Sequence, residues 1–195
     1  MAYALIQAGM QSTKNYFADK SLWLYVPLLA LFVYLFFDIM SFRAEHTPIS
    51  IIGALYTVEF GVHELSHIVM ASFPSIVHLS AGAVGEIAFT IVIAVVAIKQ
   101  RSYFAAIFGF LWVMLAFNSE GRYMADARTM LLPTIGPGGT GGNDWNYVFS
   151  QVGWLSYDKE IGAAMIIIGD VIGAVALLVG AYIVIRIGMQ KLIKT

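Results

Sequence analysis

The chain has 195 residues, of which 59% are hydrophobic and only 12% are charged, and its mean hydropathy is +0.79. A soluble domain carries about 25% charged and roughly 45–50% apolar residues, so this composition predicts an all-α integral membrane protein. The net charge of −1 excludes a nucleic-acid binder. Because no cysteine is present, disulfides are excluded and a transition metal would need His, Asp or Glu ligands.

The apolar stretches predict the helices in chain order. Residues 1–20 have the alternation of an amphipathic helix, which favours an interfacial segment over a signal peptide. Residues 21–195 are expected to form a single transmembrane domain, since no linker or repeat divides them. Spanning a bilayer takes about 20 apolar residues. On that basis we expect about five transmembrane helices, over residues 21–42, 49–73, 79–98, 103–118 and 161–188.

A polar, glycine-rich loop, residues 119–160, is predicted between the fourth and fifth spans. Dense glycines before Gly142 cannot continue a helix, so this segment lies outside the bilayer or lines a protein-walled cavity. The sequence that begins at Asp144 and ends at Tyr147 is either a lid over a site or part of a short helix, capped by Asn143 and ending at Val152. The distribution of basic residues slightly favours a cytoplasmic C-terminus, and we expect the plasma membrane of a prokaryote as the host.

The second predicted span contains the pentapeptide HELSH, from His63 to His67. Residues four apart project from one face of a helix, so the two imidazoles could share a Zn²⁺ at about 2.0–2.1 Å. Glu64 projects about 100° away around the helix, where it could act as a general base towards metal-bound water. A charged residue at the centre of a span costs roughly 2.5–3.5 kcal/mol. This cost favours a metal site over an inert polar cluster.

A catalytic zinc usually has three protein ligands, and the third must come from another segment. Glu59, one turn before His63, could support an imidazole N–H or pair with a neighbouring chain. Glu86 could join the site or make a hydrogen bond within the bundle. Asp170 could join the site or pair with Arg122 or Arg128. Spacing alone leaves the third ligand open among Glu86, Glu120, Asp126, Asp144, Asp170 and His78.

These residues resemble the site-2 protease family of intramembrane zinc metalloproteases, which carry HExxH in a membrane helix. A later helix of that family has the pattern Asn-x-x-Pro-x-x-x-x-Asp-Gly, and Asn118 and Asp126 have the same separation. The resemblance implies that Asp126 is the third zinc ligand beside His63 and His67. It also implies that Glu64 is the base and that Asn118 orients the substrate backbone or the oxyanion.

The chain departs from the family pattern at three points. Gly121 replaces the proline, Ala127 replaces the final glycine, and Arg128 could pair with Asp126 and make that aspartate structural. Residues 81–86 match the small-residue opening of the family's middle core helix only loosely. Their small side chains should still let the third span approach the second closely.

The leading interpretation is an intramembrane zinc-dependent endopeptidase that cleaves a transmembrane protein substrate. The alternative is a non-catalytic metal-binding subunit or scaffold that works with partner subunits. An open coordination position beside Glu64 would favour the first, and a closed set of four ligands the second. A third class, an ion or proton transporter, could use Glu59, Glu64, Glu86 and Asp170 as a chain of carboxylates. However, the inverted repeat common in transporters is not detectable in the sequence.

Overall fold

The computed structural model describes residues 21–41, 50–132 and 142–192. Over these residues the chain is helical, with six α-helices, a short 3-10 segment and no sheet. The interfacial helix predicted at residues 1–20 lies outside the described residues, as do the glycines of segment 133–141. The elements are α2 (Leu22–Ser41), α3 (Ile51–Val69), α4 (Ser75–Lys99), α5 (Tyr103–Ala125), α6 (Asp144–Val152), η2 (Leu155–Tyr157) and α7 (Asp158–Leu192).

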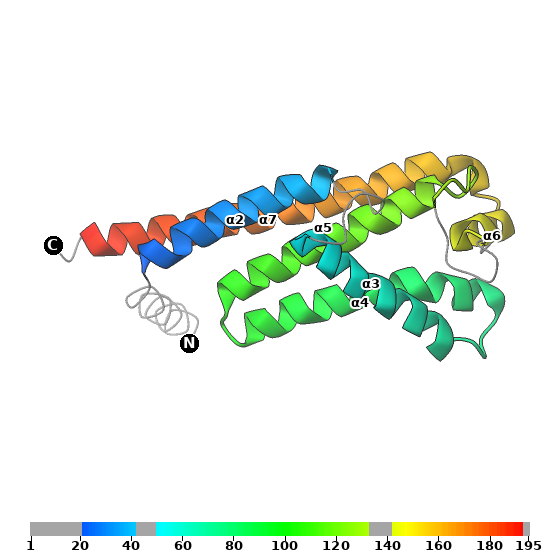
Figure 1. Cartoon of the computed structure of the whole chain (residues 1–195), viewed down its shortest axis with the longest axis horizontal. Coiled ribbons are helices and arrows are strands. Elements are labelled where there is room, and N and C mark those ends of the chain that lie inside the picture. Colours follow the sequence, from blue (N-terminus) through cyan, green and yellow to red (C-terminus); the bar gives the residue numbers. More distant parts are fainter. Residues whose placement is uncertain (1–20, 42–49, 133–141, 193–195) are drawn as a thin grey trace, which may run out of the picture.

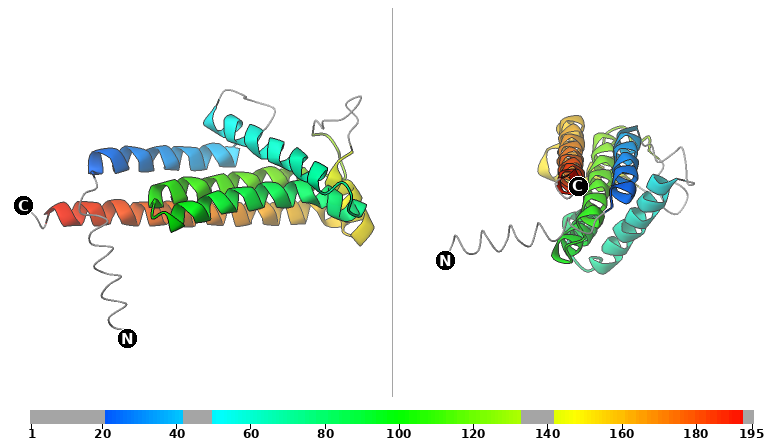
Figure 2. Two further views of the ribbon diagram at one scale, coloured as in Figure 1. Left: turned by 90° about the horizontal axis from the view of Figure 1, so that it is seen from below. Right: turned by 90° about the vertical axis from the view of Figure 1, so that its left-hand side faces the viewer.

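Helix α5 lies at the centre of the bundle, packed between α4 and α7 (Figure 1). Helix α2 packs along α7, while α3 is inclined to the other long helices where it crosses α4 (Figure 2). Helix α6 lies at the end of the bundle where α3 turns into α4 (Figure 1). The end of α3, the start of α4, the end of α5 and α6 are therefore neighbours in space.

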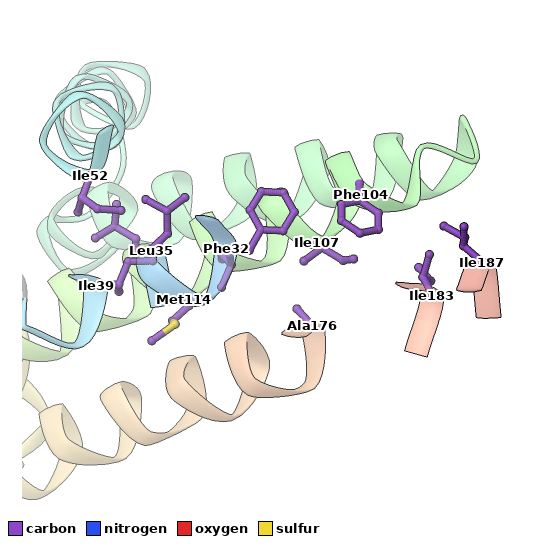
Figure 3. Packing of buried hydrophobic residues seen from close by; sticks show 12 residues of the cluster. Phe32, Leu35, Ile39, Ile52, Phe104, Ile107, Met114, Ala176, Ile183 and Ile187 are labelled. Atoms are coloured by element: carbon purple, nitrogen blue, oxygen red, sulfur yellow. The ribbon is translucent and has the colours of Figure 1, made fainter. Parts of the chain in front are cut away.

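The buried apolar core follows from the position of α5. Within its most apolar stretch 67% of the residues are buried, against 33% or less in the other long apolar helices. Side chains from α2, α3 and α7 pack against it (Figure 3). The members of this cluster are Phe32, Leu35, Ile39, Ile52, Phe104, Ile107, Leu111, Met114, Leu115, Ala176, Ile183 and Ile187.

Four of the described helices are long and apolar enough to cross a membrane: α2, α4, α5 and α7 with η2. They indicate an integral membrane protein, as the composition predicts. Helix α3, which corresponds to the predicted span 49–73, is not one of them. Its 19 residues include Glu59, His63, Glu64 and His67, which lower its hydropathy. Two of these side chains, Glu59 and His63, are buried inside the bundle, so protein rather than lipid surrounds them.

The predicted loop 119–160 is wrong in part, because it includes the end of α5, all of α6 and η2, and the start of α7. Helix α5 continues through Glu120 and Arg122 to Ala125 instead of ending at Asn118. The fold accommodates both polar residues. Glu120 is buried, and the Arg122 guanidinium donates a hydrogen bond to the Met40 carbonyl at 2.9 Å. Helix α6 is a short helix at the position expected for the Asn143 cap.

The contact between α5 and α7 depends on two glycines. A Cβ on Gly121 would meet the Gly162 carbonyl at 2.6 Å, and a Cβ on Gly162 would overlap the Gly121 carbonyl in turn. Small residues at such a crossing let two helix backbones touch, which is a main source of attraction between helices in lipid.

Replacing Gly162 with Val should therefore separate α5 from α7 and destabilise the protein by about 1–3 kcal/mol, the usual cost of overpacking. The matched control is Ala163→Val, since Ala163 is the next residue of α7 and is exposed. Thermal unfolding in detergent would measure both variants. Equal midpoints for the two would show that the close contact contributes nothing to stability.

Candidate metal centre

The two histidines of the HELSH sequence lie side by side on α3. Ser50 caps the helix by accepting a hydrogen bond from the Gly53 amide at 2.9 Å. From there the helix runs unbroken past both histidines, whose ring centroids are 4.8 Å apart. His63 is buried and His67 is half-buried, so both rings face the protein. The prediction that the two histidines project from the same face of the helix is confirmed.

Helix α4 makes room for the first histidine. A Cβ on Gly82 would overlap the His63 ring, and a Cβ on Gly85 would overlap the Ser66 side chain. The expectation that the small residues of this segment bring α4 close to α3 is thus confirmed. Only a residue without a side chain can face His63 at position 82.

A carboxylate completes a group of three possible metal ligands. Asp144 Oδ2 lies 3.5 Å from His63 Nε2 and 3.2 Å from His67 Nε2. Each residue offers one ligand atom, and the three atoms lie within 4.8 Å of one another. Four ligands at about 2.0–2.1 Å from a tetrahedral zinc are separated by about 3.3–3.4 Å. The two measured distances bracket that separation, so the group has the dimensions of a metal site.

Asp144 is the first residue of α6 and is fixed there by α5. The Asn143 side chain caps α6 by accepting from the Asn146 amide at 3.1 Å, and its own amide group donates to the Tyr123 carbonyl at 3.1 Å. The Tyr123 hydroxyl accepts from the Asp144 amide at 3.0 Å and lies 3.4 Å from Asp144 Oδ2. The Asn146 side chain adds a bond to the Ala127 carbonyl at 2.8 Å. The cap predicted at Asn143 is confirmed.

The far nitrogen of His67 is also held in place. His67 Nδ1 lies 2.8 Å from the His78 carbonyl, to which it can donate a proton. This bond leaves the lone pair on Nε2, the nitrogen that faces Asp144. Histidines that bind zinc usually have such a support. His78 therefore contributes its backbone, while its ring lies 5.3 Å from that of His67.

On its other side, the His63 ring meets two buried carboxylates. His63 Nδ1 lies 3.2 Å from Glu86 Oε2 on α4 and 3.1 Å from Glu120 Oε1 on α5. The second oxygen of Glu86 lies 3.4 Å from the Ser119 hydroxyl, and that of Glu120 accepts from Trp145 Nε1 at 2.9 Å. His63, Glu86 and Glu120 form a second group, fully buried, that could hold a metal ion.

Glu59 lies one turn before His63 and is completely buried. Neither of its carboxyl oxygens has a hydrogen-bond partner among the described residues, and Trp112 Nε1 is likewise without an acceptor there. The charges that act most strongly on Glu59 are those of Glu86 and Glu120. Glu59 thus neighbours the two carboxylates that contact His63, and the Trp112 and Ser119 side chains also lie beside it.

Asp126, the third ligand implied by the family resemblance, belongs to neither ligand group of the described residues. Its carboxylate closes the turn after α5 instead. It accepts hydrogen bonds from the Thr129 hydroxyl and from the amides of Leu131 and Leu132, the latter two at 3.0 and 2.8 Å. Its possible pairing with Arg128 is not formed, because that guanidinium pairs with Asp158 at 2.6 Å.

Two further predicted site residues, Asn118 of α5 and Asp170 of α7, contact each other. Asn118 donates its side-chain amide to Asp170 Oδ1 at 3.0 Å and to the Met114 carbonyl at 3.1 Å. The partner of Asp170 is thus Asn118, and not Arg122 or Arg128 as considered from the sequence. The side-chain oxygen of Asn118, Oδ1, is buried and has no hydrogen-bond partner in the described part of the chain.

Glu64, the predicted base, is exposed on α3 directly after the first histidine. Its carboxylate forms no hydrogen bond or ion pair within the described ranges. It therefore remains available to a bound molecule.

Sequence reasoning missed Tyr123 and Ser119. The available signal was the polar run from Asn118 to Tyr123, in which Glu120 and Tyr123 are three apart and would share a helix face. Ending the fourth span at Asn118 placed this run in a loop and hid the signal.

The chain matches no protein-family model, no curated protein and no solved structure. The function must therefore be argued from the geometry of the centre itself.

The structure distinguishes two aspartates as metal ligands. Asp144→Asn should lower zinc affinity by more than the roughly 10–100-fold typical of losing a supporting hydrogen bond, because it removes a ligand charge. Asp126→Asn should keep the zinc and instead loosen the turn after α5, at a cost of about 1–3 kcal/mol. Metal content by mass spectrometry and thermal unfolding measure these effects. The reverse pattern would assign the ligand role to Asp126.

Gly82 offers a test of the packing around His63. Gly82→Ala should displace the ring and reduce bound zinc well below one ion per chain, because the new methyl group occupies the ring's space. Gly61→Ala is the matched control, since a Cβ at Gly61 meets nothing within 4 Å. Metal analysis of both purified variants gives the answer, and full zinc content in Gly82→Ala would refute the steric argument.

Proposed function

We propose that the chain is an intramembrane zinc-dependent endopeptidase. One observation carries the proposal: His63 and His67 of α3 and Asp144 of α6 present three ligand atoms within 4.8 Å of one another. Two imidazoles and one carboxylate are a donor set that zinc accepts, and catalytic zinc sites use three protein ligands with a fourth position open. The resemblance of the HELSH sequence to site-2 proteases supports the two histidines as ligands, although the third ligand proposed here is Asp144 and not the Asp126 that the family pattern implies.

Zinc bound there would polarise a peptide carbonyl and lower the pKa of a water molecule to about 7. Glu64 follows His63 directly, is exposed and has no partner among the described residues. Its carboxylate can therefore accept a proton from the attacking water and pass it to the amine that leaves. His67 keeps its metal-facing nitrogen unprotonated because its other nitrogen donates to the His78 carbonyl.

The substrate we propose is a transmembrane protein segment. On α3, the apolar side chains of Leu65 and Ile68 are 56% and 71% exposed beside Glu64, which gives a membrane-embedded chain a surface to pack against. Four other described helices are long and apolar enough to cross a membrane, which fits a substrate that is itself in the membrane. The charge distribution along the sequence favours a cytoplasmic C-terminus in a prokaryotic plasma membrane.

The alternative function is a non-catalytic membrane subunit in which the metal ties α3 to α6. The observation that favours it is the extent of the hydrogen bonding that already fixes Asp144, through Asn143 and Tyr123. A metal added to such a framework could serve stability alone and support partner subunits.

The two functions differ in their response to Glu64→Gln. In the protease, this variant should keep about one zinc per chain and lose at least about 100-fold of the cleavage rate, the contribution typical of a general base. The assay uses purified protein in detergent with fluorescein-labelled casein, a loosely folded substrate, and metal content is measured in parallel. Glu160→Gln, at an exposed position on α7, is the matched control.

Zinc-dependent cleavage that disappears in Glu64→Gln and persists in Glu160→Gln would support the endopeptidase. Bound zinc with no cleavage by the native chain, together with a lower unfolding temperature after zinc removal, would favour the structural subunit.

A further inference from the structure

Three carboxyl groups are buried close to one another, and two of them, those of Glu86 and Glu120, contact the His63 ring. Glu59, Glu86 and Glu120 come from α3, α4 and α5, and their side chains are 0%, 4% and 3% exposed. We call these three residues the acidic cluster. Burying even one ionised carboxylate without a partner is prohibitively costly, so buried charges are normally paired or bind metals.

The acidic cluster has more hydrogen-bond acceptors than the His63 ring has protons to offer them. His63 Nδ1 can carry a single proton, yet oxygens of both Glu86 and Glu120 approach it, at 3.2 and 3.1 Å. Glu59 forms no hydrogen bond of ordinary geometry with a described residue, although the Trp112 and Ser119 side chains lie close enough to act on its carboxyl group. The strongest electrostatic influences on Glu59 and Glu86 come from other carboxylates and from His63, with no lysine or arginine among them.

The geometry that points to a cation is the approach of two buried carboxylate oxygens, those of Glu86 and Glu120, to the single nitrogen His63 Nδ1. The Glu59 carboxyl is fully buried and close enough to those of Glu86 and Glu120 for their charges to act on it. Meanwhile Trp145 Nε1 donates to the outer oxygen of Glu120 at 2.9 Å, and the outer oxygen of Glu86 lies 3.4 Å from the Ser119 hydroxyl, which also donates to the Ala116 carbonyl at 3.0 Å. Carboxylates that bind metals are oriented in this way, with one oxygen fixed and the other directed inwards.

We propose that Glu86, Glu120 and His63 Nδ1 bind a second divalent cation, to which Glu59 adds the third negative charge. The ligand atoms of Glu86, Glu120 and His63 lie within 4.8 Å of one another. The inference rests on the proposed function, since the first cation is the zinc on the Nε2 side of the same ring. The His63 ring then lies between two cations, and its Nδ1 proton is released to solvent when the second one binds.

The chemistry of the two sites differs. Two imidazoles and one carboxylate suit zinc, whereas a site rich in carboxylates suits a harder cation such as Mn²⁺. With zinc alone, four carboxylates, those of the acidic cluster and Asp144, would face two positive charges. A second divalent cation raises the positive charge to four, against the four carboxylates and the His63 ring once its proton has left.

The test loads the full-length protein in detergent with one equivalent of Zn²⁺ and then titrates Mn²⁺. Free Mn²⁺ is followed by its electron paramagnetic resonance signal, and zinc by mass spectrometry. We expect one Mn²⁺ per chain. Glu86→Gln and Glu120→Gln should each weaken Mn²⁺ binding at least about tenfold and keep the zinc, while His67→Ala should lose the zinc and keep the Mn²⁺.

Two controls separate loss of a ligand from loss of structure. Trp145→Phe removes the donor to Glu120 but leaves the carboxylate, so it should bind Mn²⁺ better than Glu120→Gln does. Glu160→Gln should match the native chain in both metals. Retained zinc in Glu86→Gln shows that this variant is folded.

The proposal is overturned if the native chain takes up no Mn²⁺ and no second Zn²⁺. It is equally overturned if Glu86→Gln and Glu120→Gln bind Mn²⁺ as tightly as the native chain. Failure of the proposed zinc site would give a different pattern, with zinc content independent of His67 and Asp144.

Discussion

The structure depends on one constraint, which is that charged side chains inside an apolar bundle must find partners within the protein. His63 is the residue through which this constraint is met. Its ring touches a carboxylate on three different helices: Glu86 on α4, Glu120 on α5 and Asp144 on α6. These contacts account for the glycine opposite the ring, for the length of α5 and for the position of α6. Without them the end of the bundle would enclose acidic groups that lipid cannot solvate.

The same network joins the packing of the helices to the chemistry of the centre. Helix α5 contributes hydrophobic residues to the core along most of its length and then, in its last turns, supplies Glu120 and Tyr123 to the centre. Trp145 links the two sides of the centre, since it neighbours Asp144 in α6 and donates to Glu120. A change on one side of the His63 ring is thus transmitted to the other through a chain of direct contacts. The proposed hydrolytic and second-cation sites are therefore parts of one buried unit.

The sequence predicted what local patterns determine. Composition identified a helical membrane protein, the four-residue spacing placed His63 and His67 on one face, and Asn143 was identified as a helix cap. Contacts between distant segments could not be derived in this way. Asp144 and Asp126 were equally plausible ligands by residue type, and only the docking of α6 onto Tyr123 distinguishes them. The fourth span was also predicted to end too early, because hydropathy treats Glu120 as unfavourable in a membrane helix. It takes no account of His63 on α3, which contacts Glu120.

The order of the ligands along the chain has a consequence for biosynthesis. His63 leaves the ribosome about 80 residues before Asp144, and a chain is synthesised at roughly 5–20 residues per second. When α3, α4 and α5 have been synthesised, the histidines and glutamates are present but Asp144 is still missing. The incomplete centre would then be an exposed, acidic intermediate with some affinity for any available cation. On the proposed assignment, metal loading would accordingly be a late event, completed only when α6 packs against α4 and α5.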